Sequence, residues 1–183
     1  MSSLPDDRAT ADEHVHDPAA PLQRALDLGY RHLAKRDRTQ AEVRRHLSAK
    51  ELDEASIDGA IGALVRQGYL DDGRYARAFA EDRRALDDWG PQRIERRLLA
   101  LGVDPELVDQ ALADADPTGE LDAAVVLLRR RCREIPATDR ERERALGLLV
   151  RKGYDPELAY DAVRALAREG ESSSRAGPGV AGR

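Results

Sequence analysis

Aromatic residues and cysteine are scarce in this sequence of 183 residues, which contains one Trp, one Phe and one Cys. The single cysteine, Cys132, excludes an intrachain disulfide and is typical of a reducing compartment, so we expect a cytoplasmic protein. No alternation of Val, Ile, Thr or Tyr with polar residues predicts a β-strand. No apolar stretch approaches the roughly 18 residues that a membrane-spanning helix needs, and we expect no membrane contact.

Residues that favour helix are abundant instead. Ala, Leu, Glu, Asp and Arg dominate the composition, and straight-chain residues and Ala lose little conformational freedom in a helix. The sequence therefore predicts an all-α protein. Its net charge of −5 argues weakly against a protein that coats DNA on its own, because such proteins normally carry an excess of positive charge.

The sequence contains no recognisable catalytic constellation. It lacks a glycine-rich phosphate loop, and its four histidines (His14, His16, His32 and His46) do not have metal-ligand spacing. The acidic pairs Asp71-Asp72 and Asp87-Asp88 fall at expected helix ends, where capping explains them. We therefore predict no catalytic residue, no metal and no cofactor, and we do not expect an enzyme.

Two single residues have competing interpretations. Cys132 lies among arginines, which lower a thiol pKa, but it shares a helix face with Leu121, Val125 and Leu128. A buried structural thiol is the preferred interpretation. Trp89 precedes a predicted helix start, and a hydrophobic staple with Ile94 is favoured over an exposed ring that stacks on a base.

Both ends of the sequence are polar. Residues 1–20 are acidic and residues 171–183 are rich in Ser and Gly, so we expect disordered tails around a folded part at 21–170. Helix-start and helix-stop signals divide this part into about nine helices. These signals are two capping boxes, three Asp-Pro pairs and three stop glycines: Thr39–Glu42, Thr138–Glu141, Asp104-Pro105, Asp116-Pro117, Asp155-Pro156, Gly68, Gly102 and Gly153.

The helices are expected to form three repeats of three. An offset of 51 residues relates Gly102 to Gly153, and the same offset relates the apolar triplets Leu47, Leu98, Leu149 and Val43, Ile94, Ala145. Such a period in helical sequence indicates tandem units that bury their faces against one another. We place the repeats at 21–70, 71–116 and 117–170. The first repeat is expected to differ, with Glu51 at the glycine position and one extra residue before Ile57.

Apolar spacing predicts which face of each first helix is buried. Spacings of three and four residues place the apolar residues of each helix on one face. The predicted faces consist of Leu22, Leu26, Gly29 and Leu33 in the first repeat, Tyr75, Phe79 and Leu86 in the second, and Leu121, Val125, Leu128 and Cys132 in the third.

Charge is segregated along the chain. From Arg24 to Lys50 there are eight basic residues and three acids, and from Glu51 to Asp82 there are eight acids and three arginines. The middle helices are basic and the third helices acidic. Stacked repeats would then present a positive stripe able to follow a phosphate backbone, whereas the alternative is an ordinary solvated surface. The candidate contacts are Arg36, Arg38, Arg44, Arg45, Arg93, Arg96, Arg97, Arg129 and Arg130.

Three sequence elements resemble the RecX regulatory family over residues 22–169. The most specific is Gly68-Tyr69-Leu70-Asp71-Asp72-Gly73-Arg74-Tyr75-Ala76, which is similar to the family signature Gly-Tyr-Leu-Asp-Asp-x-Arg-Phe/Tyr-Ala. Upstream, Arg36 to Val43 resembles an Arg-x-Arg-Ser-x-x-Glu-Leu element, with Thr39 in place of Ser. Downstream, Arg83 and Gly90 to Ile94 resemble an Arg…Gly-x-x-Arg-Ile element. Glu51 departs from a frequent glycine of the family.

The resemblance implies a fold and a partner. Family members are elongated, curved arrays of three-helix, helix-turn-helix-like units that bind the RecA recombinase filament. They restrain its growth or stability and lower its ATPase, strand-exchange and co-protease activities. We also expect a monomer, and the positive stripe predicts weak, salt-dependent binding to single- or double-stranded DNA. The signature residues Gly68, Tyr69, Leu70, Asp71, Asp72, Arg74, Tyr75 and Ala76 are interpreted as structural.

Two other classes remain open at this point. A helix-turn-helix transcription regulator would bind duplex DNA tightly and in a sequence-dependent manner. A helical adaptor without nucleic-acid affinity would tolerate reversal of the stripe charges.

Overall fold

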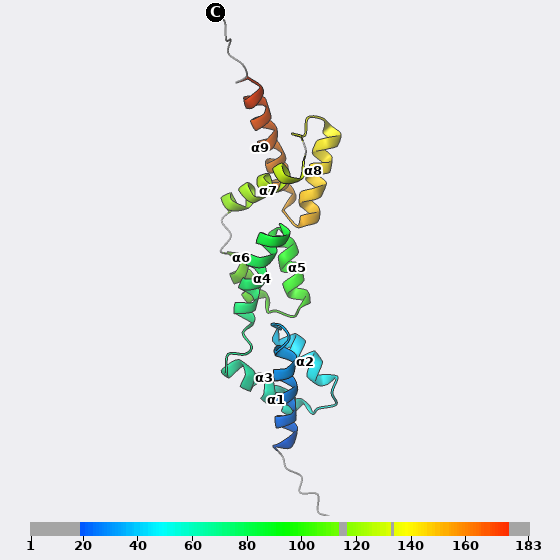
Figure 1. The fold of residues 1–183 in the computed structure, drawn as a ribbon, viewed down its shortest axis with the longest axis vertical. Coiled ribbons are helices and arrows are strands. Elements are labelled where there is room, and N and C mark those ends of the chain that lie inside the picture. The colour runs from blue at the N-terminus through cyan, green and yellow to red at the C-terminus, as the bar shows by residue number, and fades with distance from the viewer. Residues whose placement is uncertain (1–18, 114–116, 133, 176–183) are drawn as a thin grey trace, which may run out of the picture.

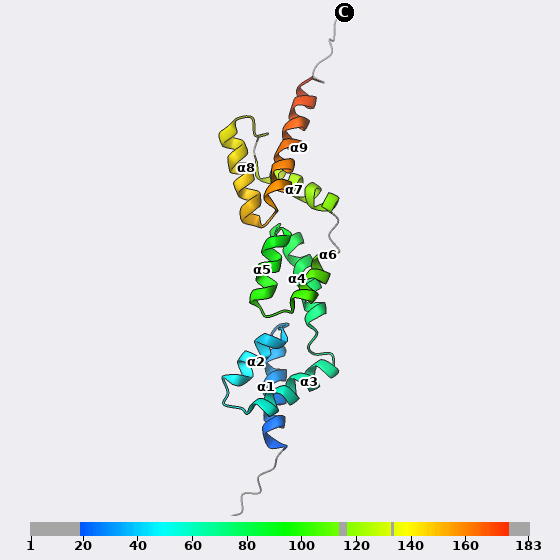
Figure 2. The ribbon, with the colours of Figure 1, turned by 180° about the vertical axis from the view of Figure 1, so that it is seen from behind.

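The computed structural model describes residues 19–113, 117–132 and 134–175, and within these ranges it contains nine α-helices and no β-strand. The predicted all-α fold is confirmed. The helices form three successive groups of three along one long axis, so the molecule is an elongated array of repeats (Figures 1 and 2). No helix in the described ranges is long and apolar enough to cross a membrane.

Each repeat contains a first, a middle and a third helix. The first helices are α1 (Ala20–Leu33), α4 (Asp72–Asp87) and α7 (Pro117–Arg131). The middle helices are α2 (Gln40–Ser48), α5 (Pro91–Ala100) and α8 (Asp139–Lys152). The third helices are α3 (Glu54–Arg66), α6 (Pro105–Ala113) and α9 (Pro156–Arg175).

Local sequence signals account for where these helices begin. Thr39 and Thr138 form the two predicted capping boxes, in which each Thr hydroxyl accepts from the backbone N–H of the Glu three residues later. Asp104 and Asp155 accept from backbone N–H groups just beyond the following proline, at 2.9 Å and 2.8 Å. Asp116 lies outside the described residues, although α7 does begin at the next residue, Pro117.

The repeat offset of 51 residues is retained throughout the middle and third helices. A residue within three positions of the end of each middle helix has a positive φ, +55° at Glu51, +83° at Gly102 and +92° at Gly153. The first buried hydrophobic residues of the third helices, which have the same offset, are Ile57, Val108 and Ala159. The prediction of an extra residue before Ile57 is therefore wrong. An extra residue would make Ile57 equivalent to Leu107. Leu107 is only half-buried, however, and the buried residue at the equivalent position is the neighbouring Val108.

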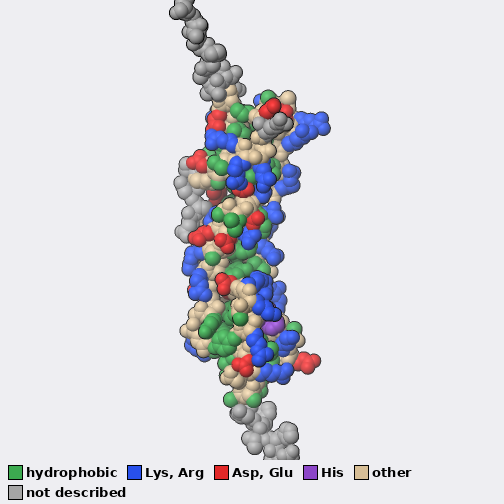
Figure 3. Space-filling model, in the orientation of Figure 1, with side chains coloured by type: hydrophobic (Ala, Val, Ile, Leu, Met, Phe, Trp, Pro, Cys, Tyr) green, Lys and Arg blue, Asp and Glu red, His purple; other side chains and the backbone are tan. Residues whose placement is uncertain are grey.

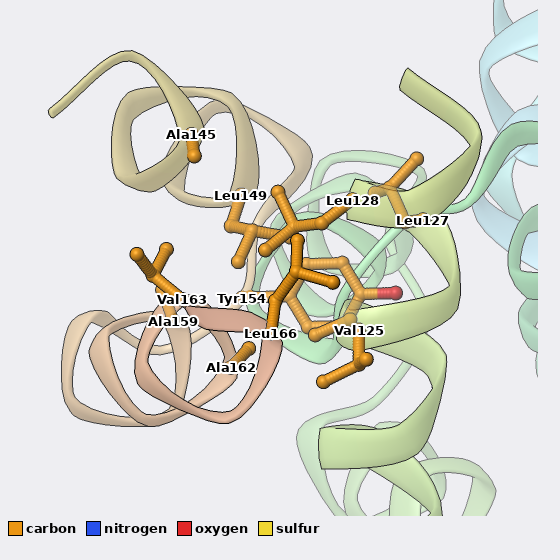
Figure 4. Close-up of a cluster of buried hydrophobic side chains, with 11 residues drawn as sticks. Val125, Leu127, Leu128, Ala145, Leu149, Tyr154, Ala159, Ala162, Val163 and Leu166 are labelled. Carbon is orange, nitrogen blue, oxygen red and sulfur yellow. The ribbon is translucent and has the colours of Figure 1, made fainter. Parts of the chain in front are cut away.

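Each repeat has its own hydrophobic core. The triplets Val43, Ile94, Ala145 and Leu47, Leu98, Leu149 are all buried, one member of each in each repeat. Burying one such leucine contributes about 1.5–3 kcal/mol. Figure 4 shows the core of the third repeat, where the side chains of all three helices converge around Leu149 and Leu166. The helices that pack extensively against each other belong to the same repeat.

The buried faces of the first helices match the prediction in part. Val125 and Leu128 of α7 are buried as expected. In α4, however, the buried hydrophobic residues are Ala76 and Ala80, and Leu86 is 75% exposed. Alanines allow α4 to lie close to α6, and the larger Tyr75 and Phe79 then pack at the edge of the core. The predicted burial of Leu86 is therefore wrong, and this residue lies at the end of α4.

The last helix is longer than expected. We predicted a disordered tail from residue 171, but α9 continues to Arg175. Ser and Glu are compatible with a continuing helix, and the strong helix-breaking pair Gly177-Pro178 comes only later in the sequence. Residues 1–18 and 176–183 of the expected tails lie outside the described residues.

The middle helices meet end to end at both junctions between repeats. At the start of α5, the backbone N–H groups of Gly90 and Gln92 donate to the carbonyls of Lys152 and Gly153, at 2.8 Å and 3.1 Å. At the start of α2, the Thr39 hydroxyl donates to the Leu101 carbonyl at 2.8 Å. N–H groups in the first turn of a helix have no partner within that helix, so the next repeat supplies acceptors for them.

Glycine is required at the junction between the second and third repeats, where α8 meets α5. A Cβ at Gly153 would lie within 3.0 Å of three atoms of Arg93, and the φ of Gly153 is +92°. We predict that Gly153→Ala lowers the free energy of unfolding by about 3 kcal/mol or more, through backbone strain and through the clash with α5. Urea unfolding followed by circular dichroism measures this loss.

Gly68→Ala is the matched control. Gly68 also has a positive φ of +76°, but nothing lies within 4 Å of the added Cβ. This variant should lose only about 1 kcal/mol from backbone strain. Equal losses in the two variants would show that close approach at the junction contributes nothing.

Candidate interface: a cationic column and a junction pocket

The three middle helices, α2, α5 and α8, form one basic column along the molecule, which we name the cationic column. Because the start of α2 meets the end of α5, and the start of α5 meets the end of α8, their peptide dipoles point in the same direction. Lys and Arg side chains gather along the edge of the molecule that these helices occupy (Figure 3). The stacked repeats thus bring basic segments that are far apart in the sequence onto one side.

Three of the nine candidate arginines are exposed on the column without an ion pair among the described residues: Arg45, Arg96 and Arg97. Arg45 and Arg96 each donate from Nε to a carbonyl of their own helix, at 3.3 Å and 3.1 Å, which leaves the guanidinium charge uncompensated. They occupy equivalent positions in the first two repeats. These three residues are best placed to meet phosphates or carboxylates of a partner.

The other candidate arginines of the first repeat are paired internally. Arg36 and Arg38 donate to the Glu42 carboxylate at 2.8 Å and 3.4 Å. Arg44 bonds Glu54 at 3.2 Å and also pairs with Asp58. Burial alone would raise the pKa of Glu42, but the Thr39 backbone N–H and the two guanidinium groups together hold it below its usual range.

The remaining three candidates belong to contacts that hold the structure together. Arg93 lies over the Trp89 ring at 4.3 Å and donates to the Arg151 carbonyl of the next repeat at 3.1 Å. Arg130 pairs with Asp88 across the same junction. Arg129 forms two hydrogen bonds to Glu169 of α9, at 3.2 Å and 2.6 Å.

Trp89 and Cys132 have surroundings that suit a structural role. Trp89 is half-buried against the core that contains Ile94, and its ring meets Phe79 edge to face at 6.2 Å. The half-buried Cys132 packs against the third core, and burial raises the pKa of its thiol, which disfavours the reactive thiolate. Within the described residues, no group of three or more His, Cys, Asp or Glu side chains could hold a metal ion.

The signature residues serve the end of α3 and the start of α4. Gly68 has the positive φ of a helix stop, and Leu70 and Ala76 are buried. The Asp71 carboxylate caps α4 by accepting from the Arg74 backbone N–H at 2.8 Å. The buried Asp72 accepts through its carboxyl from the Gln40 backbone N–H at 2.9 Å and so links the first two repeats, and burial raises the pKa of this carboxyl.

Tyr69 differs from the other hydrophobic signature residues, Leu70, Tyr75 and Ala76, because it is 57% exposed. It contacts Tyr30 edge to face, with ring centroids 5.2 Å apart. Its exposure points to a role other than filling the core.

The structure also brings together two sets of residues that the sequence analysis kept apart. A pocket of about 400 Å³ lies between the first and second repeats, and we name it the junction pocket. It is lined by Arg36, Asp37, Arg38, Tyr69, Asp71, Arg74, Tyr75, Ala78, Phe79, Asp82 and Arg83. Arg36 and Arg38 come from the candidate contacts and Tyr69 to Tyr75 from the signature. Asp82 was not predicted as a site residue, because no sequence motif marks it.

Comparison with known proteins gives one family. Residues 25–64 match the model of the RecX first three-helix domain, and residues 71–112 match that of the RecX second three-helix domain. A regulatory protein RecX from Thermus thermophilus is 36% identical over 148 residues, which cover 80% of this chain and 95% of that protein. Another, from Halorhodospira halophila, is 31% identical over 164 residues, or 90% and 99% of the two chains.

A solved structure has the same fold. The crystal structure of RecX from Lactobacillus salivarius superposes with a TM-score of 0.71 and covers 84% of this chain and 99% of its own. The two sequences are 20% identical, so this likeness concerns the fold.

A histidine pair lies between α1 and α2 among basic side chains. The His32 and His46 rings stack with centroids 3.9 Å apart and planes at 4°. Burial lowers the pKa of both imidazoles, and nearby positive charge lowers it further, from Arg36 and Arg38 for His32 and from Lys35, Lys50 and Arg38 for His46. The folded protein therefore keeps both rings neutral at a pH where the unfolded chain already protonates them.

This pair predicts a loss of stability at mildly acidic pH. As the pH falls below 6.5, the ordinary histidine pKa, the unfolded state takes up protons that the folded state resists, so the free energy of unfolding decreases. His46→Gln removes one of these groups and should lose less stability than the wild type between about pH 7.5 and about pH 5.5. Urea unfolding at both pH values measures the difference. The same pH-dependent loss in variant and wild type would exclude the pair as its source.

Proposed function

Because this chain belongs to the RecX family of regulatory proteins, we propose that it is a negative regulator of RecA. In this proposal it binds the RecA–DNA filament and limits its growth or destabilises it. RecA ATPase, strand-exchange and co-protease activities fall as a consequence. Family membership carries the proposal, and the fold supports it, since an elongated array offers an extended surface suited to a filament.

The cationic column supports a contact with DNA or with acidic surfaces of RecA. Arg45, Arg96 and Arg97 present charges along one side, and a duplex or single strand carries regularly spaced phosphates. The overall charge of −5 limits affinity for free DNA, so we propose weak, salt-dependent binding. We further propose that the protein acts as a monomer in the cytoplasm, where a RecA filament forms on DNA.

Two alternative functions are each supported by one specific observation. Three-helix units of helix-turn-helix type would also suit a transcription regulator, which would bind one duplex sequence far more tightly than others. A helical adaptor would use the same surface without DNA affinity, and the internal pairing of Arg44 and Arg129 is compatible with that.

The decisive test is the single-stranded-DNA-dependent ATPase of the cognate RecA, titrated with this protein. Inhibition at less than one molecule per RecA monomer would support filament regulation. No effect on the ATPase or on filament length, at concentrations where the protein is folded, would exclude the function. A duplex-binding assay would then address the transcription regulator.

The column predicts which arginines matter in this assay. We expect the double variant Arg45→Glu, Arg96→Glu to need about tenfold more protein for half-maximal inhibition, because it replaces two unpaired positive charges with negative ones. Arg66→Glu with Arg77→Glu is the control, since it reverses two exposed charges on α3 and α4 outside the column. An equal loss in the control would show that only net charge matters.

A further inference from the structure

The junction pocket has a counterpart between the second and third repeats. A shift by the repeat offset of 51 residues moves five of its lining residues onto five residues that line a second pocket, of about 420 Å³. The corresponding pairs are Asp37 and Asp88, Arg38 and Trp89, Tyr69 and Glu120, Tyr75 and Val126, and Phe79 and Arg130. The same architectural position thus occurs twice with different chemistry.

In the counterpart pocket, one ion pair joins two of the lining residues, although Nη2 of Arg84 has no hydrogen-bond partner among the described residues. Arg130 pairs with Asp88 across it. Burial raises the pKa of Glu120, and the attraction of nearby Arg84 opposes that rise. A ligand would have to compete with these internal contacts.

The charges of the junction pocket do not pair with one another. Arg36 and Arg38 bond Glu42, and Arg83 pairs with Asp87, but neither acid lines the pocket. The Nε atoms of Arg38 and Arg83 have no hydrogen-bond partner. Arg74 donates to the Gly68 carbonyl at 3.1 Å and, like Asp37 and Asp82, makes no ion pair within the described part of the chain. The exposed side chains of Asp37, Arg74 and Asp82 therefore remain available to pair with a partner.

Aromatic rings form the apolar part of the same pocket. Tyr75 and Phe79 lie nearly parallel, with centroids 6.1 Å apart and planes at 18°, and both are half-buried against the second core. Tyr69 adds its exposed ring from the turn before α4. Arginine beside exposed aromatic rings is the composition that dominates binding energy at protein interfaces.

We propose that the junction pocket docks a segment of a partner protein. The segment places a large apolar side chain against Tyr69, Tyr75 and Phe79 and an adjacent carboxylate against Arg74 and Arg38. A protein segment fits better than nucleic acid because three acids, Asp37, Asp71 and Asp82, share the lining with four arginines. A phosphate backbone would be repelled by these acids, whereas a peptide pairs with charges of both signs.

The partner is a RecA subunit, a step that rests on the proposed function. The protein then uses two separate surfaces, the column for DNA or acidic patches and the junction pocket for one RecA segment.

Tyr69→Ala and Arg74→Gln test the pocket in the full chain. Each variant should raise the concentration for half-maximal inhibition of RecA ATPase about tenfold, as loss of an anchor side chain does at other interfaces. The protein's own affinity for a fluorescein-labelled oligothymidine strand should change less than about twofold, because the pocket does not bind phosphate. Circular dichroism and thermal unfolding establish that each variant is folded.

Tyr160→Ala is the matched control. Tyr160 is 57% exposed, like Tyr69, and an arginine, Arg164, lies 5.7 Å from its ring, but it belongs to α9 in the third repeat. It should inhibit RecA as the wild type does. A photo-crosslinking residue placed at position 69, and in a separate protein at position 160, provides a second measurement. Position 69 should crosslink to RecA in the filament and position 160 should not.

The outcomes separate the two proposals. If the wild type inhibits RecA and Tyr69→Ala inhibits equally well, the pocket proposal is overturned and the proposed function stands. If Tyr69→Ala weakens oligothymidine binding instead, the pocket is a nucleic-acid site and the protein-docking proposal fails. A crosslink from position 69 without ATPase inhibition supports docking and removes the regulatory function. Neither inhibition nor a crosslink overturns both.

Discussion

The end-to-end contact between successive middle helices is the constraint on which the rest of this molecule depends. Each repeat encloses its own core, so little hydrophobic surface remains to hold one repeat against the next. The first turn of a helix has unpaired N–H donors and the last turn has unpaired carbonyls, and the junctions pair one with the other. Gly90 and Gly153 permit this approach, since a Cβ on either would collide with backbone of the other repeat.

The first junction uses side chains where the second uses backbone. The Thr39 hydroxyl reaches the Leu101 carbonyl, and the Asp72 carboxyl accepts from the Gln40 N–H. The Thr39 hydroxyl donates where the Gly90 N–H donates at the second junction, and the Asp72 carboxyl accepts where a backbone carbonyl, that of Gly153, accepts there. Two chemistries therefore give the same geometry, which explains why α2, α5 and α8 continue in one line (Figure 1).

The aligned middle helices determine what the surface can do. Once three basic helices share a side, repulsion among their arginines has to be offset, and Glu42, Glu54 and Asp58 offset part of it. Arg45, Arg96 and Arg97 keep their charge available. The two junction pockets also differ, because Asp88 and Arg130 form an ion pair within the pocket between the second and third repeats, whereas, within the described residues, no ion pair joins two lining residues of the pocket between the first and second repeats.

Much of this fold could be predicted from the sequence because its signals are local. Capping boxes, Asp-Pro starts and stop glycines act within one turn, so the helix boundaries followed from short stretches of chain. The repeat of 51 residues predicted which of Leu47, Leu98 and Leu149 are equivalent, and all three are buried. The prediction was wrong near Ile57, because the equivalent position in the second repeat has two adjacent apolar residues, Leu107 and Val108, and only Val108 is buried.

The sequence by itself determined the all-α class, the repeat period and the segregation of charge by helix, because each depends on residue type and spacing within a few turns. Only the tertiary structure decided which arginines are unpaired, because Arg93 and Arg130 bond residues 58 and 42 positions away. It alone brought Arg36 and Arg38 to Tyr69 and Arg74. Those residues meet only when one repeat docks on the next, and no local pattern encodes that contact.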